Sequence, residues 1–332
     1  MTDTVMLSGS RCGDISRAVR ILREGGLVAF PTETVYGLGA DAQNDLAVRR
    51  IFDVKGRPTG HPLIVHLANL ELIEAWVPEM SPLARSLARA FWPGPLTLIV
   101  RRGARISTVV TGGGETVGVR VPGHPVAQEM LVEFGGPVAA PSANRFGRVS
   151  PTRADHVIED LAGQIDAVLD GGPCAVGLES TILDVSGKDP AILRPGGITS
   201  EQLAAAVGRP LPLLSSAPVP APGQHASHYA PRAEVLIVQS HEIAARAAVL
   251  RESGRKVVAL LRAGQGVSLL DVPVLALPTS ESDLAHSLYE LLREVDRGGF
   301  EVALVTLPDE HGLGLAIADR LRRAAGPREQ TG

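Results

Sequence analysis

The sequence predicts an α/β protein of two domains, and three features support this. Short apolar runs alternate with segments whose apolar residues recur at helical spacing, a pattern typical of layered α/β folds. At 332 residues the chain is long for one domain, since domains usually hold roughly 100–200 residues. Between Leu211 and Pro231 the periodicity gives way to proline, alanine and serine. We therefore expect a first domain over residues 1–210, a linker over 211–232 and a second domain over 233–332.

The first predicted helix covers Asp14 to Glu24. Apolar residues such as Ile15 and Leu22 recur there at helical spacing, and Gly25-Gly26 ends the helix. The apolar run from Leu27 to Phe30 then predicts a strand, which leads into a polar loop. The same alternation continues through the first domain. Further strands are expected at Pro62–Leu67, Leu96–Arg101, Val117–Val121, Val138–Ala140, Ala167–Asp170 and Thr181–Val185, and further helices at Leu46–Val54, Pro82–Trp92, Val126–Glu133 and Arg153–Asp160.

The second domain shows a simpler alternation of strands and helices. Such an order predicts a small Rossmann-like sheet of about 95 residues. The expected strands are Glu234–Val238, Lys256–Leu261, Val272–Leu277 and Glu301–Leu307, and the expected helices are Glu242–Glu252, Ser280–Asp296 and Leu315–Ala325.

The composition excludes several classes of protein. Hydrophobic residues make up 45% of the chain and charged residues 20%, a globular balance. No window approaches the roughly 20 apolar residues of a membrane span, and Met1 to Arg11 lacks the order of a signal peptide. We therefore expect a cytoplasmic protein with no membrane partner. A net charge of −4 and 3% aromatic residues argue against a broad nucleic-acid-binding face.

The usual signatures of metal and nucleotide binding are missing. Cys12 and Cys174 are the only cysteines and stand far apart, so we expect neither a disulfide framework nor a protein metal site. Neither GxxxxGK[ST] nor a GxGxxG between a strand and a helix occurs. The Gly112-Gly113-Gly114 run could hold an anion, but a turn between strands is favoured.

Polar loops that follow apolar strands are the best candidates for a functional site. Together they supply four cations and several hydroxyls, which suit a polyphosphate and a small zwitterion. Taken singly, each loop also fits a capped turn or a solvated surface arginine. The cations are Lys55, Arg57, Arg120 and Arg194, and the hydroxyls come from Thr32, Thr34, Ser142 and Ser180.

A set of motifs resembles the YrdC/Sua5 family in order and approximate spacing. The set comprises PTETVYGLGADA, KGRPTGHPLIVHL, WPGPLT, VGVRVPGHP, APSAN, LESTILDV and ILRPGGIT. HYAP after the linker and GLGLAIADRLRRAA near the end resemble the long, two-domain Sua5 form. The resemblance spans nearly the whole chain. It implies a first domain in which a strongly twisted mixed α/β sheet surrounds a positively charged cavity.

The resemblance also implies a role for individual residues. A catalytic set facing ATP would consist of Lys55, Arg57, Ser142 and Asn144. The ATP-binding residues would be Arg57, His61, Thr116, Ser142, Ser150, Arg194 and Tyr229. The threonine pocket would draw on Thr32, Thr34, Tyr36, His66, Arg120, Ala140 and Ser180. Backbone groups near Thr116 and Ala140 could serve either subsite.

The activity implied by the resemblance is the synthesis of threonylcarbamoyl-AMP from L-threonine, bicarbonate and ATP, with release of pyrophosphate. The amine would form a carbamate, whose oxygen attacks the α-phosphorus of ATP. Positioning and charge neutralisation would suffice, without a covalent enzyme intermediate. Mg²⁺ would be bound through the ATP phosphates. The product would serve a downstream transferase that modifies adenosine 37 of tRNA.

Three positions depart from the common family pattern. In the linker, Gln224 to Ser227 replace a basic and aromatic stretch, Phe146 stands where a serine is common, and Asp319 where an asparagine is common. In relatives the linker folds over the cavity mouth, so we expect a lid in which Tyr229 touches the nucleotide and water is excluded.

The sequence leaves two alternative functions open. The same domain serves carbamoyl-adenylate chemistry in hydrogenase maturation proteins, but two cysteines cannot build the zinc fingers that accompany it there. An RNA-binding module is the second alternative. The net negative charge of the chain argues against RNA binding, although a local basic cavity could bind RNA weakly.

Overall fold

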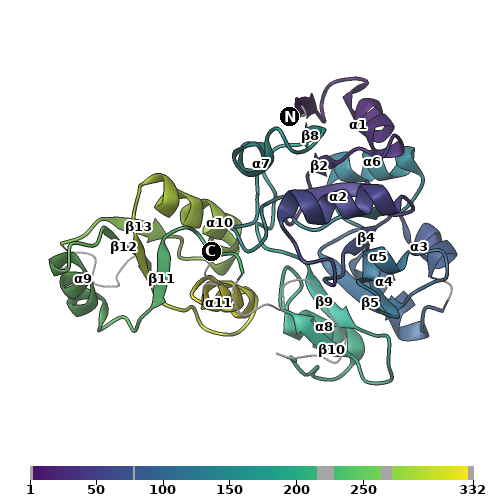
Figure 1. The fold of residues 1–332 in the computed structure, drawn as a ribbon. Coiled ribbons are helices and arrows are strands. Elements are labelled where there is room, and N and C mark those ends of the chain that lie inside the picture. The colour runs from purple at the N-terminus through teal and green to yellow at the C-terminus, as the bar shows by residue number, and fades with distance from the viewer. Residues whose placement is uncertain (1–2, 78, 215–227, 263–270, 328–332) are drawn as a thin grey trace. The chain divides into compact units, whose positions relative to one another are not determined.

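The computed structural model describes residues 3–77, 79–214, 228–262 and 271–327, and it divides the chain into two compact units (Figure 1). The first unit is Met1–Phe146 with Ser150–Gln224, and the second is Gly147–Val149 with His225–Gly332. The second unit therefore takes three residues from the middle of the first. Most of the predicted linker, including Gln224 to Ser227, lies outside the described residues. In the part of the chain that is described, no helix combines the length and apolar character that crossing a membrane requires.

A mixed sheet of ten strands forms the centre of the first unit. Its order is β1-β8-β2-β3-β7-β4-β6-β5-β9-β10, with both parallel and antiparallel neighbours. The mixed α/β architecture expected from the sequence is confirmed. The strands are β1 (Val5–Ser8), β2 (Val28–Phe30), β3 (Gly37–Asp41), β4 (Ile64–His66), β5 (Leu96–Arg101), β6 (Thr116–Arg120), β7 (Val138–Ala139), β8 (Ala167–Asp170), β9 (Thr181–Asp184) and β10 (Ala191–Arg194).

Helices pack against both faces of this sheet because its buried strands are apolar on both sides. In β2, Val28 and Phe30 pack with α1 and α6, whereas Ala29 lies in the core that contains α2, α4 and α7. Successive side chains of a strand point to opposite faces, which explains the division. The helices are α1 (Asp14–Arg23), α2 (Asp45–Lys55), α3 (Leu70–Trp76), α4 (Pro82–Phe91), α5 (Thr108–Thr111), α6 (Pro125–Phe134), α7 (Ala154–Leu161) and α8 (Ser200–Val207).

Helix α2 has well-defined ends, and its last turn carries a predicted site residue. The Asn44 side chain accepts hydrogen bonds from the backbone amides of Leu46 and Ala47, which fixes the start. Gly56, at φ 62°, ends the helix in the left-handed conformation. The cap therefore sets where Lys55 and the loop after it lie.

Some elements were not predicted because their sequences lack a clear period. Strand β3 reads GLGAD, and glycine weakens the strand signal. Glycine is nevertheless required at Gly39, where a Cβ atom would lie 2.9 Å from the Phe30 ring. The Gly112 to Gly114 run ends helix α5 and leads into β6, so it forms a turn between a helix and a strand and not the turn between two strands that was expected. The other unpredicted elements are β1, α3, α5, β10 and α8.

The second unit is a parallel four-stranded sheet covered by helices, which confirms the expected second α/β sheet. The strand order is β11-β14-β12-β13. Helix α9 packs on the face that presents Val257 and Ala259, and α10 and α11 lie on the opposite side (Figure 1). The strands are β11 (Glu234–Ile237), β12 (Val257–Arg262), β13 (Val274–Leu277) and β14 (Val302–Val305), and the helices are α9 (Ile243–Glu252), α10 (Glu281–Arg297) and α11 (Leu313–Ala324).

Candidate active site

Four cationic side chains are buried in the first unit, at the ends of strands and helices. Lys55, Arg57, Arg120 and Arg194 are each 7% exposed or less. Burying a charge is costly unless it is paired or hydrogen-bonded, so each of these residues must have local partners. Those partners show how the predicted loops are connected.

Lys55 joins the end of α2 to the loop that follows β7. Its ammonium donates hydrogen bonds to the carbonyl of Ser142, at 2.7 Å, and to that of Asn144. In return, the Phe146 amide donates to the Lys55 carbonyl at 2.8 Å. Burial, and secondarily the neighbouring Arg57, lower the pKa of Lys55, while Asp160 raises it. Lys55 therefore fixes the backbone that carries Ser142 and Asn144.

Arg57 lies beside an aromatic residue that departs from the family pattern. Its Nη2 donates to the Pro62 carbonyl at 3.1 Å, and its guanidinium lies 5.7 Å from the centre of the Phe146 ring. The His61 ring is 5.6 Å from the same ring. Phe146 thus connects Arg57 and His61, two residues expected on the nucleotide side.

Arg194 and Ser180 form a second cluster across β9 and β10. The guanidinium donates to the Ser180 carbonyl at 2.9 Å and to its hydroxyl at 3.2 Å. The Ser180 hydroxyl also lies 2.8 Å from that of Thr97 in β5. Gly196 allows this packing, because a Cβ atom there would lie 2.3 Å from the Glu179 carbonyl oxygen.

Glu179 links this cluster to Ser150. The Ser150 hydroxyl donates to the Glu179 carboxylate at 2.6 Å, and both side chains are buried. A buried carboxylate therefore lies among residues that were expected to contact the nucleotide.

Arg120 lies between a histidine and a carboxylate. His66 and Arg120 are directly opposite each other in the β4–β6 pair. Arg120 donates through Nε to the Gly94 carbonyl at 3.3 Å, and its Nη2 lies 2.8 Å from the Glu33 carboxylate. Burial, with a further effect from Arg120, lowers the pKa of His66 to about 3. His66 is therefore neutral at physiological pH.

The PTET loop orders its own hydroxyls. Thr32 donates to the Val35 carbonyl at 2.6 Å, so Thr34, whose hydroxyl lies 2.7 Å away, donates to Thr32. Tyr36 is fully buried, and its hydroxyl donates to the Gly172 carbonyl at 2.8 Å. The tyrosine hydroxyl therefore holds the loop after β8.

The remaining predicted residues lie at the ends of strands or in the second unit. Thr116 is the first residue of β6, and the Ala140 amide donates to the Ile64 carbonyl at 2.9 Å. Ser142 forms an isolated bridge with Gly37. Tyr229 belongs to the second unit, where it is buried at φ 60°.

Aromatic and cationic contacts surround Tyr229 within the second unit. Its ring stacks on Tyr289 with the centroids 5.8 Å apart, and the guanidinium of the fully buried Arg320 lies 5.0 Å from its ring. Asp319, the third departure from the family pattern, contacts Arg320 at 2.6 Å and Arg323 at 3.0 Å.

Sequence reasoning missed Glu33, Glu179, Thr97 and Cys174. Cys174 is buried, its amide donates to the Thr152 carbonyl, and a backbone hydrogen bond reaches its thiol from Thr32. Burial raises the pKa of this thiol, with Glu33 as a further cause. Nothing in the sequence places Cys174 near the PTET loop. A signal did exist for the glutamates, because several buried cations require counter-charges.

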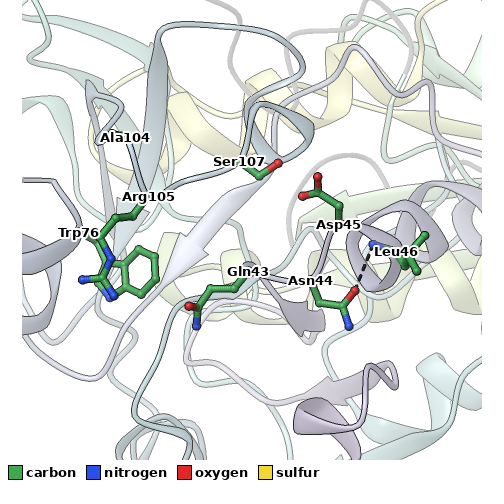
Figure 2. A pocket seen from close by; sticks show the side chains of 8 residues that line it. All are labelled: Gln43, Asn44, Asp45, Leu46, Trp76, Ala104, Arg105 and Ser107. Carbon is green, nitrogen blue, oxygen red and sulfur yellow. Dashed lines mark hydrogen bonds between the residues drawn. The ribbon is translucent and has the colours of Figure 1, made fainter.

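A separate cavity of about 720 Å³ lies elsewhere on the first unit (Figure 2). Its lining includes Asn44, Trp76 and Arg105, whose guanidinium stacks 3.8 Å from the centre of the Trp76 ring. None of the residues predicted from the sequence lines it. We therefore place the candidate site at the four buried cations.

The donor groups at the candidate site are suited to phosphate oxygens. They are ammonium, guanidinium and hydroxyl groups, whereas hard divalent cations prefer carboxylate and carbonyl oxygens. Among the described residues, no three His, Cys, Asp or Glu side chains come together as a metal site.

The buried neutral His66 predicts a specific acid sensitivity. The pKa of His66 is near 6.5 in the unfolded chain and about 3 in the folded protein. At any pH between these two values, the unfolded state therefore binds more protons than the folded state. Its contribution to stability is therefore complete above pH 6.5 and falls by about 1.4 kcal/mol per pH unit below it. Between pH 7 and pH 5 the free energy of unfolding should therefore fall by about 2 kcal/mol less in His66→Gln than in the natural chain.

Urea unfolding followed by tryptophan fluorescence checks this, because both tryptophans, Trp76 and Trp92, belong to the first unit. His241→Gln is the control, since His241 is exposed and lies in the second unit. Equal losses in His66→Gln and the natural chain would contradict the prediction.

Known proteins resemble this chain across both units. A family model described as "Telomere recombination" matches residues 20–196, and one described as "Threonylcarbamoyl-AMP synthase, C-terminal domain" matches residues 198–326. The chain is 43% identical to a Pyrococcus abyssi protein, over 94% of each chain, and 41% identical to one from Bacillus subtilis, over 95% of this chain and 93% of that one. Both are named threonylcarbamoyl-AMP synthase. The structure of P. abyssi Sua5 complexed with L-threonine matches at 40% identity with a TM-score of 0.91, over 98% of each chain.

Proposed function

Because this chain belongs to the YrdC/Sua5 family of threonylcarbamoyl-AMP synthases, we propose that the four buried cations of its first unit form the site of that synthesis. The enzyme is a transferase that makes an adenylate intermediate, and its substrates include threonine and ATP. The observation that supports the site is the burial of Lys55, Arg57, Arg120 and Arg194, with the Ser180 hydroxyl beside Arg194. Such a set suits a triphosphate and an amino acid.

The nucleotide side of the site is built around the KGRP and SAN loops. Arg57 and Arg194 would contact phosphate oxygens, and Lys55 would keep Ser142 and Asn144 in position through their carbonyls. Mg²⁺ would enter as MgATP, coordinated by the phosphates. The catalytic residues are Lys55, Arg57, Ser142 and Asn144, and further ATP contacts come from His61, Thr116, Ser150, Arg194 and Tyr229.

The threonine side is built around β6 and the PTET loop. Arg120 would bind the α-carboxylate, because a guanidinium matches carboxylate geometry. The neutral His66 and the ordered hydroxyls offer hydrogen bonds without further charge. The full set is Thr32, Thr34, Tyr36, His66, Arg120, Ala140 and Ser180.

The reaction proceeds in two steps that need no covalent enzyme intermediate. The threonine ammonium and bicarbonate give an N-carboxylate, water and one proton. An oxygen of this carbamate then attacks the α-phosphorus of ATP, the bond to the β-phosphate oxygen breaks, and pyrophosphate leaves. Arg57 and Arg194 would neutralise charge on the leaving group, so that positioning and electrostatics supply the catalysis.

Pyrophosphate release tests this function directly. We expect release only when threonine, bicarbonate and ATP are all present, with threonylcarbamoyl-AMP as the co-product. Release in carbonate-depleted buffer, or without threonine, would contradict the proposed chemistry. The product would be consumed by a transferase that modifies adenosine 37 of tRNA, which would place the reaction in the cytoplasm.

We further propose that the HYAP segment, residues 228–231, acts as a lid whose Tyr229 contacts the nucleotide. A lid would protect the carbamate and the mixed anhydride from water. Tyr229→Phe keeps the ring that stacks on Tyr289, and we expect the KM for ATP to rise roughly 3- to 10-fold by loss of one hydrogen bond to the nucleotide. Tyr289→Phe is the matched control. An unchanged KM for ATP in Tyr229→Phe would argue against contact through the hydroxyl.

A further inference from the structure

Glu33 is a half-buried carboxylate at the candidate site to which the proposed chemistry gives no role. It follows β2 in the PTET loop, and its side chain is 13% exposed. One carboxylate oxygen, Oε2, accepts a hydrogen bond from the Gly123 amide at 2.8 Å. The Glu33 carbonyl accepts another from Val176 at 2.7 Å. Both contacts fix Glu33, so the position of its second oxygen, Oε1, is well defined.

That second oxygen lies close to the Arg120 guanidinium but does not form a hydrogen bond with it. Oε1 of Glu33 and Nη2 of Arg120 are 2.8 Å apart, yet neither atom makes an aligned hydrogen bond within the described residues. Arg120 is meanwhile held from another side by the Gly94 carbonyl. A charge pair in contact but poorly aligned leaves each partner able to form a better hydrogen bond to a ligand.

The side chains next to Glu33 and Arg120 are uncharged, so the two opposite charges of this pair balance each other. His66 is neutral because burial lowers its pKa to about 3, and Cys174 is protonated because burial raises its pKa. The hydroxyls of Thr32 and Thr34 carry no charge. At this subsite one cation and one anion therefore lie side by side.

We propose that Glu33 and Arg120 together form a charge-neutral receptor for a zwitterion, in which Arg120 binds the α-carboxylate and Glu33 binds the α-ammonium of threonine. This rests on the proposed threonine subsite at Arg120. Both charged groups of an amino acid are attached to one carbon, so they match a cation and an anion in contact. Glu33 would thus exclude ligands that carry only a carboxylate, because its own charge repels them.

Glu33 would also act on the step that follows binding. When the ammonium becomes a carbamate, the nitrogen loses its positive charge and gains a neighbouring anion. Attraction to Glu33 then turns into repulsion. The carbamate is therefore driven away from Glu33, while Arg120 still holds the α-carboxylate.

The test compares dissociation constants of three ligands by calorimetry on the full chain. L-threonine carries both charges, (R)-3-hydroxybutyrate lacks the ammonium, and L-threoninol lacks the carboxylate. In the natural chain both analogues should bind at least about 10-fold more weakly than threonine, since each loses a charge-assisted hydrogen bond. Equal affinity for threonine and 3-hydroxybutyrate would overturn the proposal without any variant.

Glu33→Gln should reduce the preference for threonine over 3-hydroxybutyrate by about 10-fold, because the ammonium loses its counter-charge and the anion loses its repulsion. Glu33→Asp keeps the charge and should keep most of the preference. The control is Glu74→Gln, which removes a glutamate that pairs with Arg85 at the surface and should change nothing. An unchanged preference in folded Glu33→Gln would refute the role.

A further variant separates this inference from the proposed subsite. Arg120→Gln should weaken threonine binding if the subsite is correctly placed. Unchanged threonine affinity in Arg120→Gln would mean that the subsite itself is wrong. If Arg120→Gln binds threonine more weakly but Glu33→Gln keeps the natural preference for threonine over 3-hydroxybutyrate, only the role given to Glu33 would be wrong.

Discussion

Replacing Lys55 with methionine is expected to lower kcat/KM for ATP at least 100-fold and to destabilise the first unit by about 2–6 kcal/mol. The buried ammonium donates to the carbonyls of Ser142 and Asn144, and each buried carbonyl that loses its donor costs about 1–3 kcal/mol. The larger effect on activity follows because the loop that carries two proposed catalytic side chains loses its position, and a displacement of about 1 Å can cost 100-fold in rate.

Steady-state kinetics and urea unfolding together check this expectation. Lys188→Met is the matched control, because Lys188 is an exposed lysine of the same unit. Lys55→Arg keeps a positive charge but changes the shape of the donor, so we expect partial activity. If Lys55→Met were destabilised but kept kcat/KM for ATP within threefold of the natural enzyme, Lys55 would be structural only.

Arg57→Ala is expected to raise the KM for ATP about 10- to 100-fold while the KM for threonine changes less than threefold. A charge-assisted hydrogen bond to phosphate is worth roughly 1.5–3 kcal/mol, which corresponds to this range. Arg57→Lys should recover only part of the loss, because lysine cannot reproduce the planar contact with Phe146.

Arg49→Ala provides the control for this second prediction. Arg49 lies on α2, close to Arg57 in sequence, but is exposed. The Arg49→Ala variant should therefore have the same KM for ATP as the natural enzyme. Equal KM values for ATP in Arg57→Ala and Arg49→Ala would remove Arg57 from the nucleotide side of the site.

Helices and strands were predictable from the sequence where apolar residues recur with one clear spacing. The strand at Ala167–Asp170 was predicted with its correct ends, and α1 to within one residue, because apolar spacing and flanking glycines mark them clearly. Strands β3 and β10 were missed. The first is rich in glycine, and the second is short and ends in Arg194, so that it resembles a polar loop.

The site was only partly predictable, because its pairings depend on strand register. The family resemblance identifies His66 and Arg120 as pocket residues. Only the β4–β6 register places them opposite each other. Likewise, the contact between Arg120 and Glu33 joins residues 87 positions apart, and local sequence patterns carry no information about it. Cations were found from the sequence, whereas the carboxylates that balance them were not.

The three residues Gly147–Val149 set an order of events during synthesis of the chain. Within the second unit, the Gly147 carbonyl accepts from the amide of Ala230, and the Val149 carbonyl accepts from Arg293, 144 residues later. At about 5–20 residues per second, a ribosome needs roughly 7–30 s to add those residues. The loop between Asn144 and Ser150 therefore acquires its final partners only when nearly the whole chain has been made. A chain released early at the linker would carry this loop with its hydrogen-bonding groups exposed to water.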